Sequence, residues 1–424
     1  MSEVKVSVVM PVYNACAYLA DALESVISQS LREIEILCVD DGSTDGSYAI
    51  LEAFAERDDR IRILQQNNQF AGVARNNGLK QATGKYVIFW DSDDLFEPAA
   101  LEKLYQEAER TAAQIVVCGA NRYDTVLDEV ILTNVYLLQE RVPGNRPFSR
   151  TDMGKYIYNF AGNVPWNKLY LREFIEENQL QFEARRQAND TYFVMMAFYY
   201  AKRISVVEET LINYRIATST SITDGASKTP LCAYESYEVV LKELENREDY
   251  QGDLKQSFLN KAMSGFMLSL SVQSNFDAYR TVYQHLLEEG FARFGIDRQE
   301  KEYFYSEWMY EDYENMHRMK PEDFLVQKLI GTKDELKVKN SRIRALRERR
   351  EQLKAEREAL RARREELKAR REELKAEREQ LKAELREKNR IIKQQREVLN
   401  SRTVRYALKL KQILTLNGRL SGKR

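Results

Sequence analysis

Short apolar runs alternate with amphipathic helical patterns over the first 120 residues, and this alternation limits the chain to few folds. In the first helical pattern, apolar residues recur at the spacing of one buried helix face. A strand–helix–strand repeat of this kind predicts an α/β fold with a mostly parallel sheet flanked by helices. The runs that predict strands cover residues 4–10, 34–39, 61–64, 86–90 and 115–118.

Changes in pattern along the chain predict four segments. Residues 150–225 mix loops and short elements, and we assign them to the α/β domain, 1–225. Residues 226–332 read as helices rich in Tyr, Phe and Glu, which predicts a helical extension. Residues 333–401 consist mainly of Glu, Arg, Lys, Ala and Leu and predict a long carboxy-terminal helix or coiled coil, followed by a basic amphipathic tail at 402–424.

The composition and charge exclude several classes of protein. No run of about 18 uncharged apolar residues is present to span a bilayer, and the amino terminus lacks the sections of a signal peptide, so we expect a cytoplasmic protein. The four cysteines lie far apart without a C-x-x-C pair, which indicates neither a disulfide framework nor a zinc site.

The net charge of −1 is divided unevenly along the chain. Residues 333–424 carry 31 Lys and Arg against 15 Asp and Glu, a charge of +16, and the preceding residues carry −17. The acidic body argues against nucleic acid as a partner, whereas the basic tail suits anionic lipid or another acidic surface.

Polar segments follow three of the predicted strands, namely 11–14, 40–45 and 91–94. The carboxyl ends of parallel strands meet at one edge of a sheet, where ligands bind. Crowded carboxylates repel one another unless a cation and donor groups neutralise them, and a hard divalent ion that also holds a diphosphate suits such a site. The pattern therefore predicts a metal-bridged nucleotide.

Individual residues suit parts of that ligand. Tyr13 can stack on a base, Asp41 can accept a hydrogen bond from a base N–H, and Arg75 lies near the phosphates. Each also has a structural interpretation: the acidic segments can be turns and helix caps, Arg75 a surface residue, and Tyr13 a core residue. Their convergence at strand-to-helix junctions favours the binding site.

Other nucleotide signatures do not fit. No Gly-x-Gly-x-x-Gly follows the first strand, which argues against a dinucleotide-binding domain. The segment 78–86 resembles a P-loop but has five spacer residues and Tyr86 in place of Ser or Thr. His285 and His317, the only histidines, are interpreted as structural.

Several motifs together resemble the family 2 inverting glycosyltransferases with the GT-A fold, over residues 5–225. The matching segments are 8–14, 39–46, 72–78, 84–94, 166–170 and 214–215, with 221–223. The resemblance implies a nucleotide-sugar donor, which we expect to be a UDP-sugar, and Mg²⁺ or Mn²⁺ as the cofactor. It implies donor-binding roles for Pro11, Tyr13, Asn14, Asp41, Arg75 and Asp91, and a metal-binding role for Asp93, with Asp94 beside it.

An inverting transfer requires a general base that removes the proton from the acceptor hydroxyl. In similar proteins this carboxylate follows a Glu in a Glu-Asp-x-x-Phe segment, which here reads Asn189-Asp190-Thr191-Tyr192-Phe193. Asp190 is therefore the candidate base; the alternative is that it only caps the helix predicted at 191–201. We expect Trp166, Asn163 and Lys168 on the acceptor side, although Trp166 also suits the core.

The carboxy-terminal segment leaves two questions open. Leucines recur every seventh residue from Leu346 to Leu381, but arginines occupy the other seam position, which opposes tight pairing. A single helix supported by Glu–Lys pairs and a weak homodimer both remain predictions. Residues 402–416 place basic and apolar side chains on opposite helix faces, which is typical of membrane-surface binding or of docking on a protein.

The sequence thus predicts a metal-dependent inverting glycosyltransferase that acts on a glycan or lipid-linked acceptor in surface polysaccharide synthesis at the inner membrane face. Two alternatives are a noncatalytic nucleotide-binding scaffold that assembles a complex through the long helix, and a nucleotidyltransferase. Release of nucleoside diphosphate, of pyrophosphate, or of neither distinguishes the three.

Overall fold

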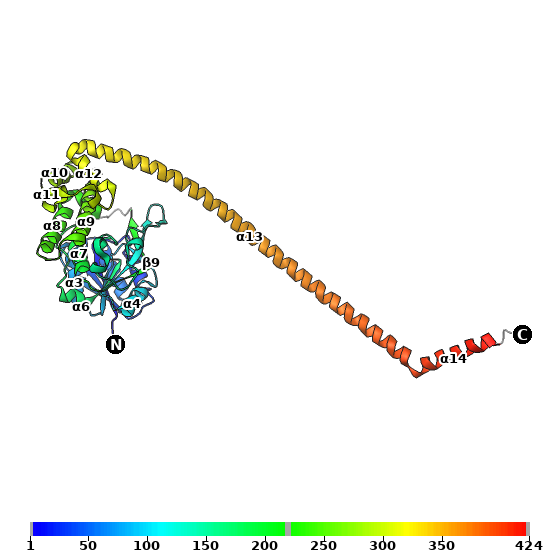
Figure 1. The fold of residues 1–424 in the computed structure, drawn as a ribbon. Coiled ribbons are helices and arrows are strands. Elements are labelled where there is room, and N and C mark those ends of the chain that lie inside the picture. Colours follow the sequence, from blue (N-terminus) through cyan, green and yellow to red (C-terminus); the bar gives the residue numbers. More distant parts are fainter. Residues whose placement is uncertain (1–2, 217–221, 421–424) are drawn as a thin grey trace. The chain divides into compact units, whose positions relative to one another are not determined.

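The computed structural model describes residues 3–216 and 222–420 and divides the chain into two compact units (Figure 1). The first is Met1–Val326 and the second is Gln327–Arg424. The predicted boundaries at 225/226, 332/333 and 401/402 remain predictions.

The first unit contains a nine-stranded mixed sheet in the order β3-β2-β1-β4-β8-β6-β9-β5, with β7 paired to β6. Strands β1 to β4 are parallel, β8 is antiparallel to both of its neighbours, and β9 is parallel to β6. The strands are β1 (Val6–Val12), β2 (Ile34–Asp40), β3 (Ile61–Gln65), β4 (Tyr86–Phe89), β5 (Leu95–Phe96), β6 (Ile115–Asp124), β7 (Glu129–Ile131), β8 (Lys168–Leu171) and β9 (Ile204–Ile216).

Both faces of the central strands are buried, as the near-continuous apolar runs predict. In β1, Val8 and Met10 pack into one hydrophobic cluster and Val9 packs into a second cluster on the opposite face. Helices cover both sides, so the predicted α/β fold is confirmed. The helices up to β9 are α1 (Leu19–Ile27), α2 (Ser47–Ala55), α3 (Phe70–Gln81), α4 (Ala100–Thr111), α5 (Arg150–Met153), α6 (Arg172–Glu177) and α7 (Thr191–Tyr200).

The helices after β9 share a core with the sheet. Tyr237 and Phe258 belong to the same cluster as Val9 in β1 and Phe193 in α7. The helical extension therefore closes one face of the α/β fold. Its helices are α8 (Cys232–Glu245), α9 (Gly252–Ser271), α10 (Phe276–His285), α11 (Phe291–Phe294) and α12 (Glu307–Arg318).

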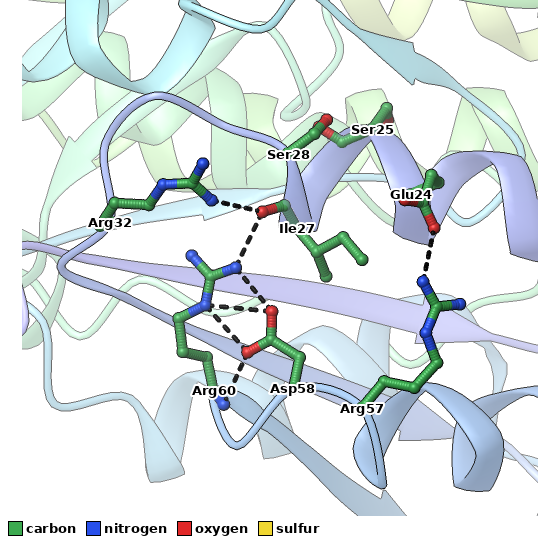
Figure 2. Close-up of polar contacts among 8 residues, drawn as sticks. All are labelled: Glu24, Ser25, Ile27, Ser28, Arg32, Arg57, Asp58 and Arg60. Carbon is green, nitrogen blue, oxygen red and sulfur yellow. Dashed lines mark hydrogen bonds and ion pairs between the residues drawn. The ribbon is translucent and has the colours of Figure 1, made fainter.

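Basic side chains hold the carboxyl end of α1 (Figure 2). Arg32 and Arg60 both donate to the Ile27 carbonyl oxygen, at 3.0 and 2.8 Å, and Asp58 pairs with Arg60. Terminal helix carbonyls lack partners within the helix, and cationic groups satisfy them well. These contacts fix α1 to the turn before β3.

Two long helices, α13 (Pro321–Asn400) and α14 (Arg402–Leu420), follow in the described part of the chain. The leucines from Leu353 to Leu381 that recur every seventh residue are exposed, and Glu–Lys pairs three residues apart line the helix. Within the described residues, no helix is both long enough and apolar enough to cross a membrane.

Candidate active site

Two adjacent cavities open at the carboxyl edge of the parallel strands. The sheet-edge cavity, about 390 Å³, is lined by all of the predicted donor-binding residues and by Asp93. The helix-side cavity, about 410 Å³, is lined by Asp190, Asn163 and Trp166, and by residues of α8 and α9. The two cavities adjoin along a shared wall of five residues, namely Ala71, Arg75, Asp91, Arg186 and Tyr214.

The loops after β1 and β2 brace each other. Asn14 adopts a left-handed backbone (φ 49°), and its side-chain Oδ1 accepts a hydrogen bond from the Thr44 N–H at 2.8 Å. Asp45 accepts from the Cys16 and Ser47 N–H groups, and these hydrogen bonds outweigh the effect of burial and lower its pKa to about 2. Asp45 thus has the turn role that the sequence left open, while Gly46 is the N-cap residue of α2.

Asp41 is held differently from its acidic neighbours. It is buried, and its Oδ1 accepts from Gln66 Nε2 at 2.7 Å and from the Gln69 N–H at 2.8 Å. Both of these hydrogen bonds end on Oδ1, so the carboxylate that lines the sheet-edge cavity retains Oδ2 for a ligand.

Arg75 connects α3 to the end of β4 and to the loop before α7. Its Nη2 donates to Asp91 Oδ1 at 2.6 Å, its Nη1 donates to Asn189 Oδ1 at 2.9 Å, and its guanidinium lies over Phe182. Gly72 allows the loop before α7 to approach α3 closely, because a Cβ at this position would lie 2.2 Å from the Glu183 carbonyl oxygen. These contacts fix the loop 182–190 against α3.

The acidic segment after β4 divides into two environments. Asp93 lines the sheet-edge cavity, and burial together with Asp91 raises its pKa to about 6. Asp94 is fully buried and lines neither cavity; its Oδ1 accepts from the Arg215 N–H at 2.8 Å, and burial raises its pKa well above the usual range.

The residues at this edge fit a divalent cation. In the part of the chain that the structure describes, no group of three His, Cys, Asp or Glu side chains could hold a metal ion by itself. A hard cation needs only one or two carboxylates when phosphate oxygens and water complete its coordination. Since Asp93 lies beside Asp91 in the same cavity, a cation there would relieve the repulsion between the two carboxylates.

Asp190 precedes α7 but makes no side-chain capping hydrogen bond to that helix. The carboxylate is half-buried and lines the helix-side cavity. Burial raises its pKa to about 6, against the opposing charges of Arg75 and Lys168. A carboxylate with this pKa is deprotonated at neutral pH and close to the value that suits a general base.

The three residues expected on the acceptor side have different environments. Trp166 is buried, stacks on Tyr214 with ring centroids 5.4 Å apart, and also lines the cavity, so both of its interpretations apply. Asn163 lines the cavity as well. Lys168 lines neither cavity; its Nζ donates to the carbonyl oxygens of Gly162 and Val164, at 2.8 and 2.6 Å, and thereby holds the loop that carries Asn163.

Several lining residues were missing from the predicted site. Tyr214 lay within the motifs but received no role, and Arg186 had no sequence signal. Tyr237 and Gln273 enter the helix-side cavity through the tertiary packing of the helical extension, which local patterns do not encode. Of the motif at 221–223, Ser221 and the side chains of Ile222 and Thr223 lie outside the described residues.

Comparison with known proteins identifies the family. A family model for "Glycosyl transferase family 2" matches residues 7–178. The "Putative glycosyltransferase EpsH" of Bacillus subtilis is 31% identical over 260 residues, which cover 60% of this chain and 74% of that relative. The chain belongs to glycosyl transferase family 2.

A second relative agrees with this assignment, and a solved structure has a similar fold. "Glycosyltransferase GlyG" of Streptococcus pneumoniae is 32% identical over 225 residues, covering 51% of this chain and 71% of that protein. The crystal structure of S. aureus TarS 1-349 in complex with UDP-GlcNAc has a similar fold, with a TM-score of 0.55 at 21% identity over 68% of this chain and 82% of that 1-349 chain. Asp190, α8 and α9 lie beyond residues 7–178.

Proposed function

We propose that this glycosyltransferase transfers a sugar from a nucleotide sugar to a hydroxyl group of a glycan or lipid-linked acceptor, with inversion at the anomeric carbon and with Mg²⁺ or Mn²⁺ bound. The observation that carries the proposal is the position of Asp190. Its carboxylate has no capping bond and lines a cavity that shares a wall with the cavity of the expected donor residues.

The sheet-edge cavity supports a nucleoside diphosphate donor. The Tyr13 ring is half-exposed at its rim and suits stacking on a base, while Asp41 Oδ2 suits a base N–H. The TarS crystal structure is described as a complex with UDP-GlcNAc, which supports a UDP-sugar as the donor.

The metal position that we propose is Asp93, and Asp94 remains a predicted second ligand. A Mg²⁺ or Mn²⁺ ion held by Asp93 would supply positive charge to the diphosphate. Arg215 supports the segment, because its Nε donates to the Asp93 carbonyl oxygen at 2.7 Å.

Asp190 performs the proton transfer in this proposal. It takes the proton from the acceptor hydroxyl while the acceptor oxygen attacks the anomeric carbon on the side opposite the diphosphate. The bond from that carbon to the diphosphate oxygen breaks in the same step, so a single displacement inverts the configuration.

The helix-side cavity supports a carbohydrate acceptor. Its lining combines aromatic rings, such as Trp166 and Tyr237, with the amides of Asn163 and Gln273. Rings suit the apolar faces of sugars, and amides suit their hydroxyl groups. Surface polysaccharide synthesis is the process that we propose for such an acceptor.

The carboxy-terminal helix supports a peripheral site of action at the cytoplasmic membrane face. Residues 398–424 contain no Asp or Glu, and α14 carries Arg402, Arg405, Lys409 and Lys411 beside exposed apolar side chains such as Leu410. Basic amphipathic helices of this kind bind anionic lipid surfaces. A homodimer through α13 is the alternative role of the carboxy-terminal region.

The experiment that tests the proposal measures release of nucleoside diphosphate by the full chain from UDP-, GDP- and dTDP-sugars with Mn²⁺, in the presence of glycan acceptors. We expect wild-type turnover with one of these donors, and Asp190→Asn should retain donor binding while losing transfer. Thr191→Ala, a change at the next residue, serves as the control for disturbance of the α7 start. Transfer at the wild-type rate by Asp190→Asn would exclude Asp190 as the base.

A further inference from the structure

Two adjacent arginines before α7 have opposite surroundings. Arg185 Nε pairs with Glu183 Oε1 at 2.8 Å, and its Nη1 pairs with Glu235. Arg186 makes no hydrogen bond or ion pair with the backbone or side chains that the structure describes, and its Nε is shielded from solvent without an acceptor. A shielded donor without a partner costs free energy, and its presence in a folded protein requires an explanation.

Arg186 lies in the shared wall between the two cavities. Its guanidinium also packs against Gly225, since a Cβ added there would lie 3.3 Å from Nη2 and 3.5 Å from Nε. It is therefore enclosed on that side and borders both cavities.

The loop that carries Arg186 is fixed on both sides of it. Ser236 Oγ donates to the Ala188 carbonyl oxygen at 2.9 Å, and Cys232 Sγ donates to the Gln187 carbonyl oxygen at 3.1 Å. On the other side, the Arg185 ion pairs anchor the chain to α8. The position of Arg186 is thus set by the fold.

The other arginines of the sheet-edge cavity already have protein partners. Arg75 is held by Asp91 and Asn189, and Arg215 donates to the Asp93 carbonyl oxygen and pairs with Asp21. Among the described lining residues, Arg186 is the arginine whose charge is left for a ligand.

We propose that Arg186 binds the diphosphate of the donor and stabilises the charge that develops on it during transfer. This inference rests on the proposed function. As the bond between the anomeric carbon and the diphosphate oxygen breaks, the electron pair stays on that oxygen, and the acceptor proton passes to Asp190. The diphosphate thus gains a negative charge, and a planar guanidinium donates two parallel hydrogen bonds to phosphate oxygens.

Calorimetric titration of the full chain tests the assignment, with Mn²⁺ present and with inorganic pyrophosphate, UDP and uridine as probes. Pyrophosphate reports on the site whatever base the donor carries. For Arg186→Gln we expect the affinity for pyrophosphate and for UDP to fall about tenfold or more, with uridine binding unchanged. Arg186→Lys keeps the positive charge but cannot donate two parallel hydrogen bonds from a planar group, so its affinity for pyrophosphate and UDP should fall by an intermediate amount.

Arg280→Gln is the control, because it removes the same charge from an exposed position on α10 that lines neither cavity and makes no contact with the loop that carries Arg186. It should bind all three probes as the wild type does. Equal losses in the two variants, or wild-type affinity for pyrophosphate and UDP in a folded Arg186→Gln, would overturn the inference while leaving the proposed function intact. Wild-type protein that bound no UDP, GDP or dTDP would overturn both.

Discussion

Arg75 and Asp91 form an ion pair in the wall between the two cavities, with 2.6 Å between Nη2 and Oδ1. The Arg75 side chain is 7% exposed and that of Asp91 25%. Charges this far from solvent depend on each other, because removal of one leaves the other desolvated and uncompensated.

Arg75→Met should therefore destabilise the protein by about 3 kcal/mol or more, since it leaves Asp91 without its partner beside Asp93. Urea unfolding of Arg75→Met, Asp91→Asn and the double variant measures this coupling. We expect the double variant to be more stable than the sum of the two single effects predicts. Strict additivity would show that the pair is not coupled.

Asp93→Asn should abolish metal-dependent donor binding and leave the fold intact, because it removes a ligand charge from the cavity lining. Titration of UDP with and without Mn²⁺ separates metal-dependent binding of UDP from metal-independent binding. The variant should bind UDP equally weakly in both conditions, whereas the wild type should bind more tightly with the metal. A normal response of the variant to Mn²⁺ would rule out Asp93 as the metal ligand.

The Asp190 carboxyl should cause the free energy of unfolding to decrease as pH rises. Its folded pKa is about 6 and its ordinary value is 3.8. Below pH 3.8 the carboxyl is protonated in both the folded and the unfolded state. Between pH 3.8 and about 6 the folded state binds more protons, so the free energy of unfolding decreases as pH rises. Above about pH 6 this contribution to the free energy of unfolding is lost completely.

Asparagine stays neutral at every pH, so Asp190→Asn should be more stable than the wild type at pH 7.5, by an amount on the order of 1–3 kcal/mol. The difference should close by about pH 4. Urea unfolding at pH 4, 6 and 7.5 gives the comparison, and a difference that is independent of pH would contradict a raised pKa. The same pKa predicts that the transfer rate decreases as pH falls through about 6.

Gly72→Ala should reduce both stability and transfer. The added Cβ would lie 2.2 Å from the Glu183 carbonyl oxygen and 3.0 Å from Asn189 Cβ, which forces the loop before α7 away from α3. Gly144→Ala is the control, because a Cβ there meets no atom within 4 Å. Gly72→Ala should have a lower melting temperature and a lower initial transfer rate than Gly144→Ala. Similar values in the two variants would mean that the loop before α7 accommodates the added Cβ without displacing Asp190.

Deletion of residues 402–424 should release the protein from anionic vesicles and leave activity on soluble acceptors unchanged. Each Lys or Arg near an anionic surface contributes about 1 kcal/mol, and the effect decays over a Debye length. Leu410→Ser with Ile413→Ser keeps the charge and should weaken flotation partly. Unchanged flotation after the deletion would instead favour protein docking or dimerisation through α13.

The lining of the sheet-edge cavity could be predicted because most of its residues follow strand ends within one repeating pattern. The predicted strands 34–39 and 61–64 lie within β2 and β3 as observed. β8 and β9 lie in the region that the sequence predicted to mix loops and short elements. β8 has only four residues, and β9 has an irregular register opposite β6 and carries exposed polar residues such as Glu209, which interrupt an apolar strand pattern. Their assignment depends on pairing with distant strands.

The lining of the helix-side cavity, which we propose to hold the acceptor, could be predicted only in part. Asp190 was predicted from a motif. Whether its side chain makes a capping hydrogen bond to α7 depends on the backbone conformation where that helix begins. Lys168 was expected to line the acceptor side, whereas its full burial turns it into a support for the loop 162–164. The unpaired state of Arg186 follows from which neighbours the fold provides, and sequence spacing does not contain that information.

The two cavities draw their walls from different stretches of the chain. The sheet-edge cavity is built largely by the end of β1 and the loops after β1, β2 and β4, whereas α8 and α9 contribute Tyr237, Leu268 and Ser269 to the helix-side cavity alone. Exchange of α8 and α9 between members of the family could therefore redirect the enzyme to a new acceptor without rebuilding its donor site. If the two cavities hold donor and acceptor as proposed, substrate choice is modular, and the two sets of lining residues can diverge at separate rates.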